Sequence, residues 1–292
     1  MHHTLSIVLT LVKIRITMLV AITTAFGYYS FAGDSGYRML VAIAGVFLLA
    51  CGSAVINHLQ EFKLDALMER TKGRPIPSGR ISAEGALLFS LFLVLTGSAL
   101  LFFAIDWIAF LLGLMAFIWY NGIYTPLKRK TAFAVVPGSV IGALPPVIGW
   151  HAAGGSLLDP QILVIALFFF VWQIPHFWLL LLLFAKDYQA AGLPTLNRLF
   201  NDDQIARLTF IWTTATAILG VFFLFFDLIK SVPAQILIAG AAMALVFYAF
   251  RLVRPGRERK MYRMVFNSIN GFVLWMMLVT AFEKMYFVLL TP

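Results

Sequence analysis

Residues Asn57 to Gly79 read NHLQEFKLDALMERTKGRPIPSG, and they follow directly on the apolar run Met39–Ile56, which is long enough to cross a membrane. A charged side chain at the centre of a spanning helix costs about 2.5–3.5 kcal/mol on insertion scales. Asn57, Glu61 and Asp65 are spaced i, i+4, i+8, and a helix puts such positions on one face, about one turn apart. The stretch therefore predicts a spanning helix that ends in a polar site.

The polar face predicts a metal site beside a phosphate site. Its amide oxygen and two carboxylates are hard ligands of the kind that Mg²⁺ binds together with waters and substrate phosphates. Arg70, Lys72 and Arg74 follow shortly after, and an Arg side chain can hold phosphate oxygens with two hydrogen bonds. The alternative is a solvated helix end, with Lys63 or Arg70 as ion-pair partners and the other cations serving membrane topology alone.

The composition indicates an integral membrane protein. Of the 292 residues, 61% are hydrophobic and the mean hydropathy is +0.91, whereas soluble domains are about 45–50% apolar. The formal net charge of +9 would suit a nucleic-acid binder, but membrane proteins concentrate Lys and Arg in cytoplasmic loops, so we expect no nucleic-acid partner. The single cysteine, Cys51, lies in an apolar run, which excludes a disulfide framework and a CxxC motif.

Nine apolar runs are long enough to be spanning helices. They are Ile14–Phe31, Met39–Glu61, Ala83–Ile105, Trp107–Tyr124, Ala132–His151, Gln161–Phe184, Ile205–Phe226, Ala234–Phe250 and Val265–Leu290. The start of the chain has no small-residue cleavage site after a short apolar core, so we expect no removable signal peptide. The fold class predicted is all-α, an integral membrane bundle of about nine transmembrane helices in the lipid bilayer. We expect residues 1–292 to form one membrane-embedded domain.

The loops between these runs alternate in charge. Of the 22 Lys and Arg residues, all but Arg38, Lys230 and Lys284 fall in one set of loops. The positive-inside rule then places the N-terminus and the loop after Asn57 in the cytoplasm, and nine spans place the C-terminus outside. We therefore expect a multi-pass protein of the cell inner membrane whose site faces the cytoplasm.

Two further stretches could complete a site. Tyr124-Thr-Pro-Leu-Lys128 closes the fourth run, where a Tyr is ordinarily an interfacial anchor and Lys128 could reach a diphosphate. Trp172-Gln-Ile-Pro-His176 lies inside the sixth run, and an ionisable side chain within a membrane is most often functional. Trp172 and His176 would then line a cavity, with His176 as a metal ligand, a carboxylate partner or a base. The alternative is a packed His that donates to neighbouring backbone.

Acidic residues near the end of the sixth run repeat part of this pattern. Asp187 stands at the cytoplasmic end of that run, as Asp65 does for the second, and it could be a second metal-facing carboxylate. Asp202 and Asp203 come just before the seventh run and are typical of an N-cap.

Several stretches between about 57 and 196 resemble the UbiA superfamily of intramembrane prenyltransferases, and in particular its heme-modifying branch. They are NHLQEFKLDALMERTKGRPIPSG, YTPLKRKT, PGSVIGALPPVIGW, WQIPHFW and KDYQAAGLPTL, in the order expected for that branch. The resemblance implies a helical bundle around a central cavity that opens toward the cytoplasmic side. It also implies Mg²⁺-dependent transfer of a farnesyl group from farnesyl diphosphate to a vinyl group of heme B, which gives heme O.

The resemblance also implies roles for single residues. Asn57, Glu61 and Asp65 match the first metal-diphosphate motif, and Asp187 matches the last acid of the second motif. The positions that face the diphosphate are Arg70, Arg74, Tyr124 and Lys128. The second motif usually has an acid one turn before its last Asp, and Leu183 at that position makes two equal metal sites doubtful. His176 and Trp172 are expected at the heme, and a terminal oxidase or another enzyme that uses heme O is the expected partner.

Two other functions compete with this one. A prenyltransferase of the same superfamily that acts on an aromatic acid or a quinone precursor would share the diphosphate half of the site. A transporter would place its charges at the bilayer midplane, in discontinuous helices. Here the acids cluster at one membrane face beside a basic loop, which favours a phosphorylated substrate over a transported one.

Overall fold

The computed structural model describes residues 2–69, 71–184, 192, 194–196, 199–254 and 259–290. Within these residues the chain is helical and no strand is assigned. The elements are α1 (His2–Leu11), α2 (Ile14–Ala32), α3 (Tyr37–Asp65), α4 (Ala83–Ala104), α5 (Trp107–Ile118), the π-helix η1 (Trp119–Tyr124), α6 (Thr125–Leu127), the 3₁₀ turn η2 (Ala132–Ala134), α7 (Val135–Gly138), α8 (Val140–Ala152), α9 (Pro160–Leu183), α11 (Asp202–Phe225), α12 (Val232–Phe250), η4 (Arg251–Val253) and α13 (Arg259–Leu290).

The described part of the chain contains nine helical segments that are long and apolar enough to cross a membrane. Each coincides with one predicted run to within a few residues, and the largest difference is at the start of α13, which begins before Val265. The all-helical bundle and its span count are therefore confirmed. α1 is an additional helix that the hydropathy pattern did not predict.

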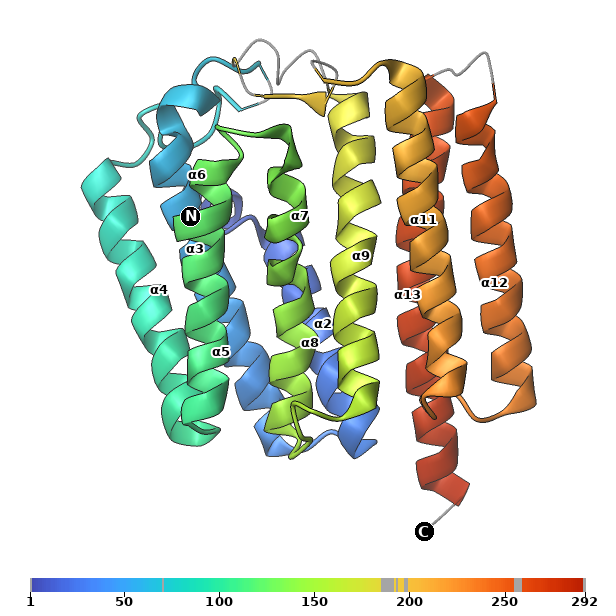
Figure 1. Ribbon diagram of the computed structural model, residues 1–292. Coiled ribbons are helices and arrows are strands. Elements are labelled where there is room, and N and C mark those ends of the chain that lie inside the picture. Colours follow the sequence, from blue (N-terminus) through green and yellow to red (C-terminus); the bar gives the residue numbers. More distant parts are fainter. Residues whose placement is uncertain are drawn as a thin grey trace.

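The long helices stand side by side in one bundle (Figure 1). α3 packs along α4, α2 packs along α8, and α9 packs along α11. The loop after α3, the connection after α6 and the C-terminal end of α9 lie at one end of the bundle, and the C-terminal end of α13 lies at the other (Figure 1). This arrangement brings the cationic loops after α3 and α6 to the same end.

Side-chain caps fix where several helices begin. The Ser82 side chain accepts from the Gly85 amide at the start of α4, and Asp106 does the same for the Ala109 amide at the start of α5. α11 begins with a capping box in which Asn201 and Gln204 exchange side-chain and backbone hydrogen bonds. The prediction that Asp202 or Asp203 caps this helix was wrong, because both residues already lie in its first turn.

α2 and α8 approach each other closely enough for their backbones to touch. A Cβ atom at Gly27 would lie 2.0 Å from the carbonyl oxygen of Pro146, and one at Gly149 would lie 1.9 Å from that of Thr24. No side chain fits at either position. Small residues at a helix interface permit such contact within a membrane, where van der Waals packing holds helices together.

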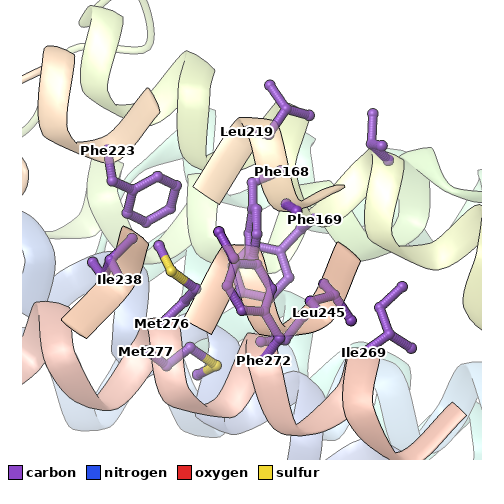
Figure 2. Packing of buried hydrophobic residues seen from close by; sticks show 14 of the residues in the cluster. Phe168, Phe169, Leu219, Phe223, Ile238, Leu245, Ile269, Phe272, Met276 and Met277 are labelled. Carbon is purple, nitrogen blue, oxygen red and sulfur yellow. The ribbon is translucent and has the colours of Figure 1, made fainter. Parts of the chain in front are cut away.

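The largest buried cluster lies among α9, α11, α12 and α13, and Figure 2 shows part of it. Phe168 is its centre: its ring meets the rings of Phe169, Phe223 and Phe272 edge to face, with centroids 5.3–6.1 Å apart. Met276 fills the space beside them. This packed half supports α9, which carries His176 on the turn beyond.

Candidate active site

One face of α3 holds three buried oxygen ligands near the end of the helix. Asn57 is 0% exposed, Glu61 is 7% exposed and Asp65 is 1% exposed. They follow one another at every fourth position, so all three lie on one side of the helix axis, as the sequence predicted. Burying two carboxylates is costly unless each is paired.

Each of the three side chains contacts a different cation, and each cation comes from a different segment. Lys13 Nζ donates to Asn57 Oδ1 at 2.6 Å, Lys128 Nζ lies 2.6 Å from Glu61 Oε1, and Arg74 Nη1 donates to Asp65 Oδ2 at 2.7 Å. The pairs neutralise the buried acids. They also gather three positive charges within reach of three oxygen ligands, which is the arrangement a metal–diphosphate complex requires.

The loop after α3 is folded back onto the end of the helix. Thr71 Oγ1 donates to the Asp65 carbonyl oxygen at 2.9 Å, and Arg74 reaches the Asp65 carboxylate. Beyond Arg74 the chain turns at Gly79, whose φ of 71° lies in the left-handed region that favours glycine. The turns hold the Arg74 guanidinium over the helix end.

A π-helix shapes the opposite wall of the site. The segment η1 ends at Tyr124, and π-helical turns within α-helices are rare and frequent at functional sites. The Tyr124 ring stacks on Tyr120 with centroids 5.7 Å apart and lies against Phe177, and Lys128 Nζ sits 5.6 Å from the centre of the Tyr124 ring. Tyr124 thus stands beside the Lys128–Glu61 pair.

The Asn57 amide is oriented from the same wall. Its Nδ2 donates to Thr125 Oγ1 at 3.0 Å, so its Oδ1 points to Lys13. Thr125 is the first residue of α6 and is 1% exposed. The side-chain oxygen of Asn57 is therefore presented as a ligand by a buried hydrogen bond.

Lys13 belongs to the site although the sequence did not single it out. It connects α1 to α2 in the left-handed conformation, with φ 51° and ψ 50°. Burial, together with the nearby positive charges of Lys128 and Arg74, lowers the pKa of Lys13 to about 7, against the opposite influence of Glu61 and Asp65. The turn between α1 and α2 places the Lys13 amine against Asn57. A hydropathy pattern does not predict such a turn.

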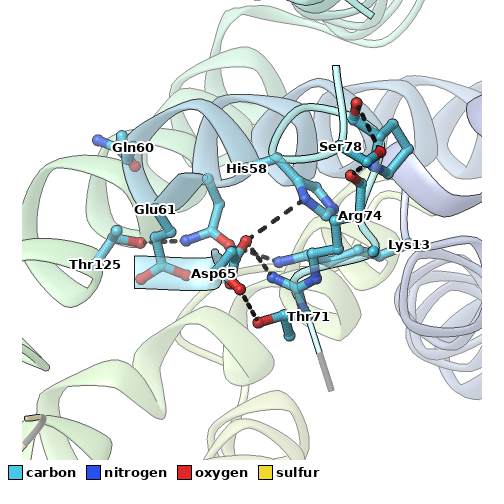
Figure 3. A network of polar contacts seen from close by, with 12 residues as sticks. Lys13, His58, Gln60, Glu61, Asp65, Thr71, Arg74, Ser78 and Thr125 are labelled. Atoms are coloured by element: carbon cyan, nitrogen blue, oxygen red, sulfur yellow. Dashed lines mark hydrogen bonds and ion pairs between the residues drawn. The ribbon is translucent and has the colours of Figure 1, made fainter. Parts of the chain in front are cut away.

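His58 is a second residue whose position was not expected. Its side chain is 1% exposed, neither ring nitrogen has a hydrogen-bond partner, and Nδ1 lies 4.0 Å from Asp65 Oδ2 (Figure 3). Buried polar groups without partners are rare in folded proteins. His58 lies directly behind the Asp65–Arg74 pair.

The structure separates other predicted residues from this group. Lys72 Nζ lies 2.7 Å from Glu69 Oε2 in a pair whose side chains are 56% and 81% exposed, so it is directed to solvent. Arg70 and Asp187 lie outside the described residues. Leu183, at the position where an acid was expected, is buried near the end of α9.

His176 and Trp172 form a separate polar spot on α9. His176 Nδ1 lies 2.7 Å from Asn270 Oδ1 on α13, and Asn270 Nδ2 donates to the Phe266 carbonyl oxygen at 2.7 Å. The rings of Trp172 and Phe266 lie 5.0 and 4.9 Å from the imidazole. Trp172 Nε1 is buried without a partner, which leaves a donor available to a ligand. Asn270 was not among the residues predicted for the site.

An apolar cavity opens beside the two ion pairs and the Lys13–Asn57 hydrogen bond. It runs between α2, α3, α5 and α8, with Lys13 and Tyr120 at its polar end and Val46, Leu49 and Ile148 at the other. Apart from Lys13, no charged side chain in the described part of the chain lines this cavity. The site thus combines a charged mouth with an apolar interior.

The donor set fits Mg²⁺. An amide oxygen and two carboxylates are hard ligands, and Mg²⁺ completes its six positions with waters and substrate phosphates. Among the described residues no three His, Cys, Asp or Glu side chains gather at metal-binding distance, so the described protein ligands alone would not form a closed metal cage. This matches a metal that enters together with a phosphorylated substrate.

The model of the UbiA prenyltransferase family matches residues 16–277. This chain belongs to the UbiA prenyltransferase family. Its similarity to curated members extends over nearly its whole length: a protoheme IX farnesyltransferase of Oleidesulfovibrio alaskensis is 34% identical over 276 residues, which are 94% of this chain and 95% of that protein. The enzyme of that name from Geobacter sulfurreducens is 43% identical over 187 residues, which are 64% of this chain and 68% of the relative.

Solved structures share the fold. The structure of a digeranylgeranylglyceryl phosphate synthase superposes with a TM-score of 0.80 at 16% identity and covers 97% of this chain and 99% of that one. A UbiA homolog from Archaeoglobus fulgidus, bound to GPP and Mg²⁺, superposes with a TM-score of 0.64 at 16% identity and covers 94% and 99%. These likenesses confirm a UbiA-type membrane bundle.

Proposed function

We propose that this chain transfers the farnesyl group of farnesyl diphosphate to a vinyl group of heme B, giving heme O and diphosphate. The observation that carries the donor half is the row of three oxygen ligands on α3, each held by its own cation, at the mouth of an apolar cavity. The acceptor half rests on the curated relatives, which are protoheme IX farnesyltransferases at 34–43% identity.

Asn57, Glu61 and Asp65 would hold Mg²⁺, and Asp187 would add a further carboxylate. When bound, the ion would neutralise charge on the diphosphate oxygens and make diphosphate a better leaving group. Leu183 removes one acid that the second motif usually has, so we expect one strongly held ion rather than two equal ones.

Lys13, Arg74 and Lys128 would bind the diphosphate oxygens. The leaving group carries about three negative charges, and fixed cations in a site that excludes water stabilise that charge most as the bond breaks. In the described structure each cation already rests against an α3 ligand, so it needs only to change partner. Arg70, on the same loop as Arg74, would also bind the diphosphate. The face of the Tyr124 ring would hold the Lys128 amine in place by a cation–π contact.

The bonds made and broken follow from this arrangement. The bond between C1 of the farnesyl group and the diphosphate oxygen breaks, and the electron pair leaves with diphosphate. The vinyl carbon of heme B bonds to C1, which leaves a cation on the adjoining carbon. Water adds to that cation and loses a proton, which gives the hydroxyethylfarnesyl side chain. The rings of Tyr120 and Phe117 at the cavity wall would stabilise the farnesyl cation.

His176 and Trp172 would contact heme. Asn270 accepts from His176 Nδ1, which leaves Nε2 free of a proton and able to ligate iron or to accept from a propionic acid group. The unpartnered Trp172 Nε1 would donate to an oxygen of the same ligand. The cationic end of the bundle, with the diphosphate mouth, would face the cytoplasm of the inner membrane, and an enzyme that uses heme O remains the expected recipient of the product.

An assay of the full chain in detergent tests this proposal. Purified protein would receive heme B, farnesyl diphosphate and Mg²⁺, and the heme products would be separated by chromatography and identified by mass. The Asp65→Asn variant and a sample with EDTA run beside it. Farnesylated heme from the wild type that is lost in both controls supports the function and the metal site. Prenylation of 4-hydroxybenzoate in place of heme would overturn the acceptor and keep the donor half.

A further inference from the structure

The apolar cavity beside the ion pairs extends along the helix axes. Residues of α2, α3, α5 and α8 line it, and each of these helices contributes residues from more than one turn. On α3 the lining positions run from Ala54 and Ser53 through Ala50 and Leu49 to Val46, away from Asn57. The cavity is therefore a channel along α3 and not a flat depression.

The length of this channel can be read from α3. A helix rises about 1.5 Å per residue, so Leu49 lies roughly 12 Å and Val46 roughly 16 Å along the axis from Asn57. With carbon–carbon bonds of about 1.5 Å, an extended isoprene unit advances about 4–5 Å, and three units span about 13–15 Å. The channel thus accommodates a C15 chain whose diphosphate lies at Asn57, and a C20 chain exceeds it by about one unit.

The far end of the channel is closed by packed side chains. Val46, Leu49 and Ile148 are between 1% and 5% exposed and belong to one buried cluster with Leu101 and Ala109. Across from Leu49 stands Gly113, where an added Cβ would lie 2.8 Å from Leu49 Cδ1 and 2.7 Å from Leu101 Cδ1. The end of the channel therefore has no free space beyond Leu49 and Val46.

We propose that Leu49, together with Val46 and Ile148, forms a floor that sets the length of the prenyl chain, so that farnesyl diphosphate is preferred over the geranylgeranyl homologue. The inference rests on the proposed function and extends it to donor selection. A prenyl chain is the ligand that this channel fits. Among the residues that the structure describes, Lys13 is the only cation on the channel wall and lies at its mouth, and the rest of the wall is apolar apart from a few hydroxyls. A heme, which carries two propionates, would leave its charges without partners there.

Two substitutions of opposite sense test the floor. Leu49→Ala deepens the channel by removing the side chain that packs against Gly113, and Ala50→Leu shortens it at about 10 Å from Asn57, where the third isoprene unit would begin. Leu93→Ala is the matched control, since Leu93 is similarly buried, at 7% exposed against 4% for Leu49, but lies on α4 outside the channel.

The measurement is the binding of C10, C15 and C20 prenyl thiolodiphosphates, which are not cleaved, to the purified full chain in detergent with Mg²⁺. Mismatch by a single methylene in an apolar pocket is worth about tenfold or more. We expect the wild type to favour C15 over C20 at least tenfold, Leu49→Ala to erase that preference, and Ala50→Leu to shift it to C10. Thermal unfolding confirms that each variant is folded.

Equal binding of C15 and C20 by the wild type would overturn the proposal and would mean that the chain leaves sideways past Ile16, which is 60% exposed. An unchanged ratio in folded Leu49→Ala, or the same shift in Leu93→Ala, would overturn it as well. Because binding needs no acceptor, these results stand apart from the heme assay: a channel that selects C15 in a protein that does not modify heme would leave the floor intact and remove only the acceptor.

Discussion

Arg74 Nη1 lies 2.7 Å from Asp65 Oδ2, and the two residues differ sharply in exposure: the Asp65 side chain is 1% exposed and the Arg74 side chain 21%. The acid is fixed in the end of α3, and the guanidinium reaches it from a loop at the edge of the bundle. Breaking a buried ion pair by removing one partner typically costs about 3–5 kcal/mol. The pair therefore favours an exchange in which the acid takes a metal ion while the cation takes an anion.

We expect metal and diphosphate to bind cooperatively for this reason. Mg²⁺ alone would have to displace Arg74 and Lys128 from their acids, and diphosphate alone would draw the cations away and leave the acids unpaired. Equilibrium dialysis of radiolabelled pyrophosphate should show at least tenfold tighter binding with Mg²⁺ than without it, a coupling of about 1.4 kcal/mol or more. Lys72→Ala, which removes only an exposed pair with Glu69, should leave the coupling unchanged. Identical pyrophosphate affinity in the two conditions would contradict the exchange.

Lys13 offers a second test of the same site. Lys13→Met keeps most of the side-chain volume and removes the charge that touches Asn57, and we expect kcat/KM for farnesyl diphosphate to fall about 10²–10³-fold, as for the loss of one stabilising donor. Lys13→Arg restores the charge with a different shape and should recover part of the rate. Arg15, which follows two residues later and is exposed, provides the control as Arg15→Met. A full rate for folded Lys13→Met would remove Lys13 from the diphosphate site.

The fold was largely predictable from hydropathy, because a spanning helix must be long and apolar wherever it lies in the chain. The three oxygen ligands were predictable for a related reason: Asn57, Glu61 and Asp65 interrupt that pattern at helical spacing, and polar groups stand out against an apolar sequence. Lys128 and Arg74 followed from the loops that adjoin the same face.

Lys13 and Asn270 could not be predicted, and the reasons differ. Lys13 reaches the site through a left-handed turn between two helices, and one residue in that conformation leaves no periodic signal. Asn270 meets His176 from a helix 94 positions farther along the chain, so the pairing depends on how α9 and α13 pack. The π-helix that ends at Tyr124 lies against Phe177 and Gly138, and the sequence pattern did not indicate it.

The opposite end of the bundle gives a pH-dependent prediction. Burial raises the pKa of Asp106, but hydrogen bonds from the Ala109 amide and the His151 side chain outweigh burial and hold that pKa below its usual value. A carboxylate with a depressed folded pKa contributes stability that is present above its unfolded pKa of 3.8 and is lost as the pH falls through the folded value.

Asp106→Asn should therefore flatten the fall in thermal stability below about pH 4, because it removes the titrating group and keeps the helix cap. Asp106→Ala removes both, and we expect it to lose a further 0.5–2 kcal/mol or so at neutral pH. Thermal unfolding in detergent between pH 3 and pH 7 measures both effects. The same acid sensitivity in Asp106→Asn as in the wild type would show that other groups control it.

The His176–Asn270 pair yields the last prediction, which concerns the acceptor. Asn270 Nδ2 is held by the Phe266 carbonyl, so Asn270 Oδ1 accepts from His176 Nδ1 and leaves Nε2 as the free lone pair. Loss of a group that orients a metal-binding His typically costs 10–100-fold in affinity. Asn270→Leu should therefore weaken heme B binding, followed by titration of its Soret band, by about that factor, and should leave the affinity for farnesyl thiolodiphosphate unchanged. Asn270→Asp, which still accepts from Nδ1, should retain heme binding.

If folded His176→Ala gave the same Soret spectrum and heme affinity as the wild type, His176 would be neither the iron ligand nor a heme contact, and Asn270 would be a packing residue between α9 and α13.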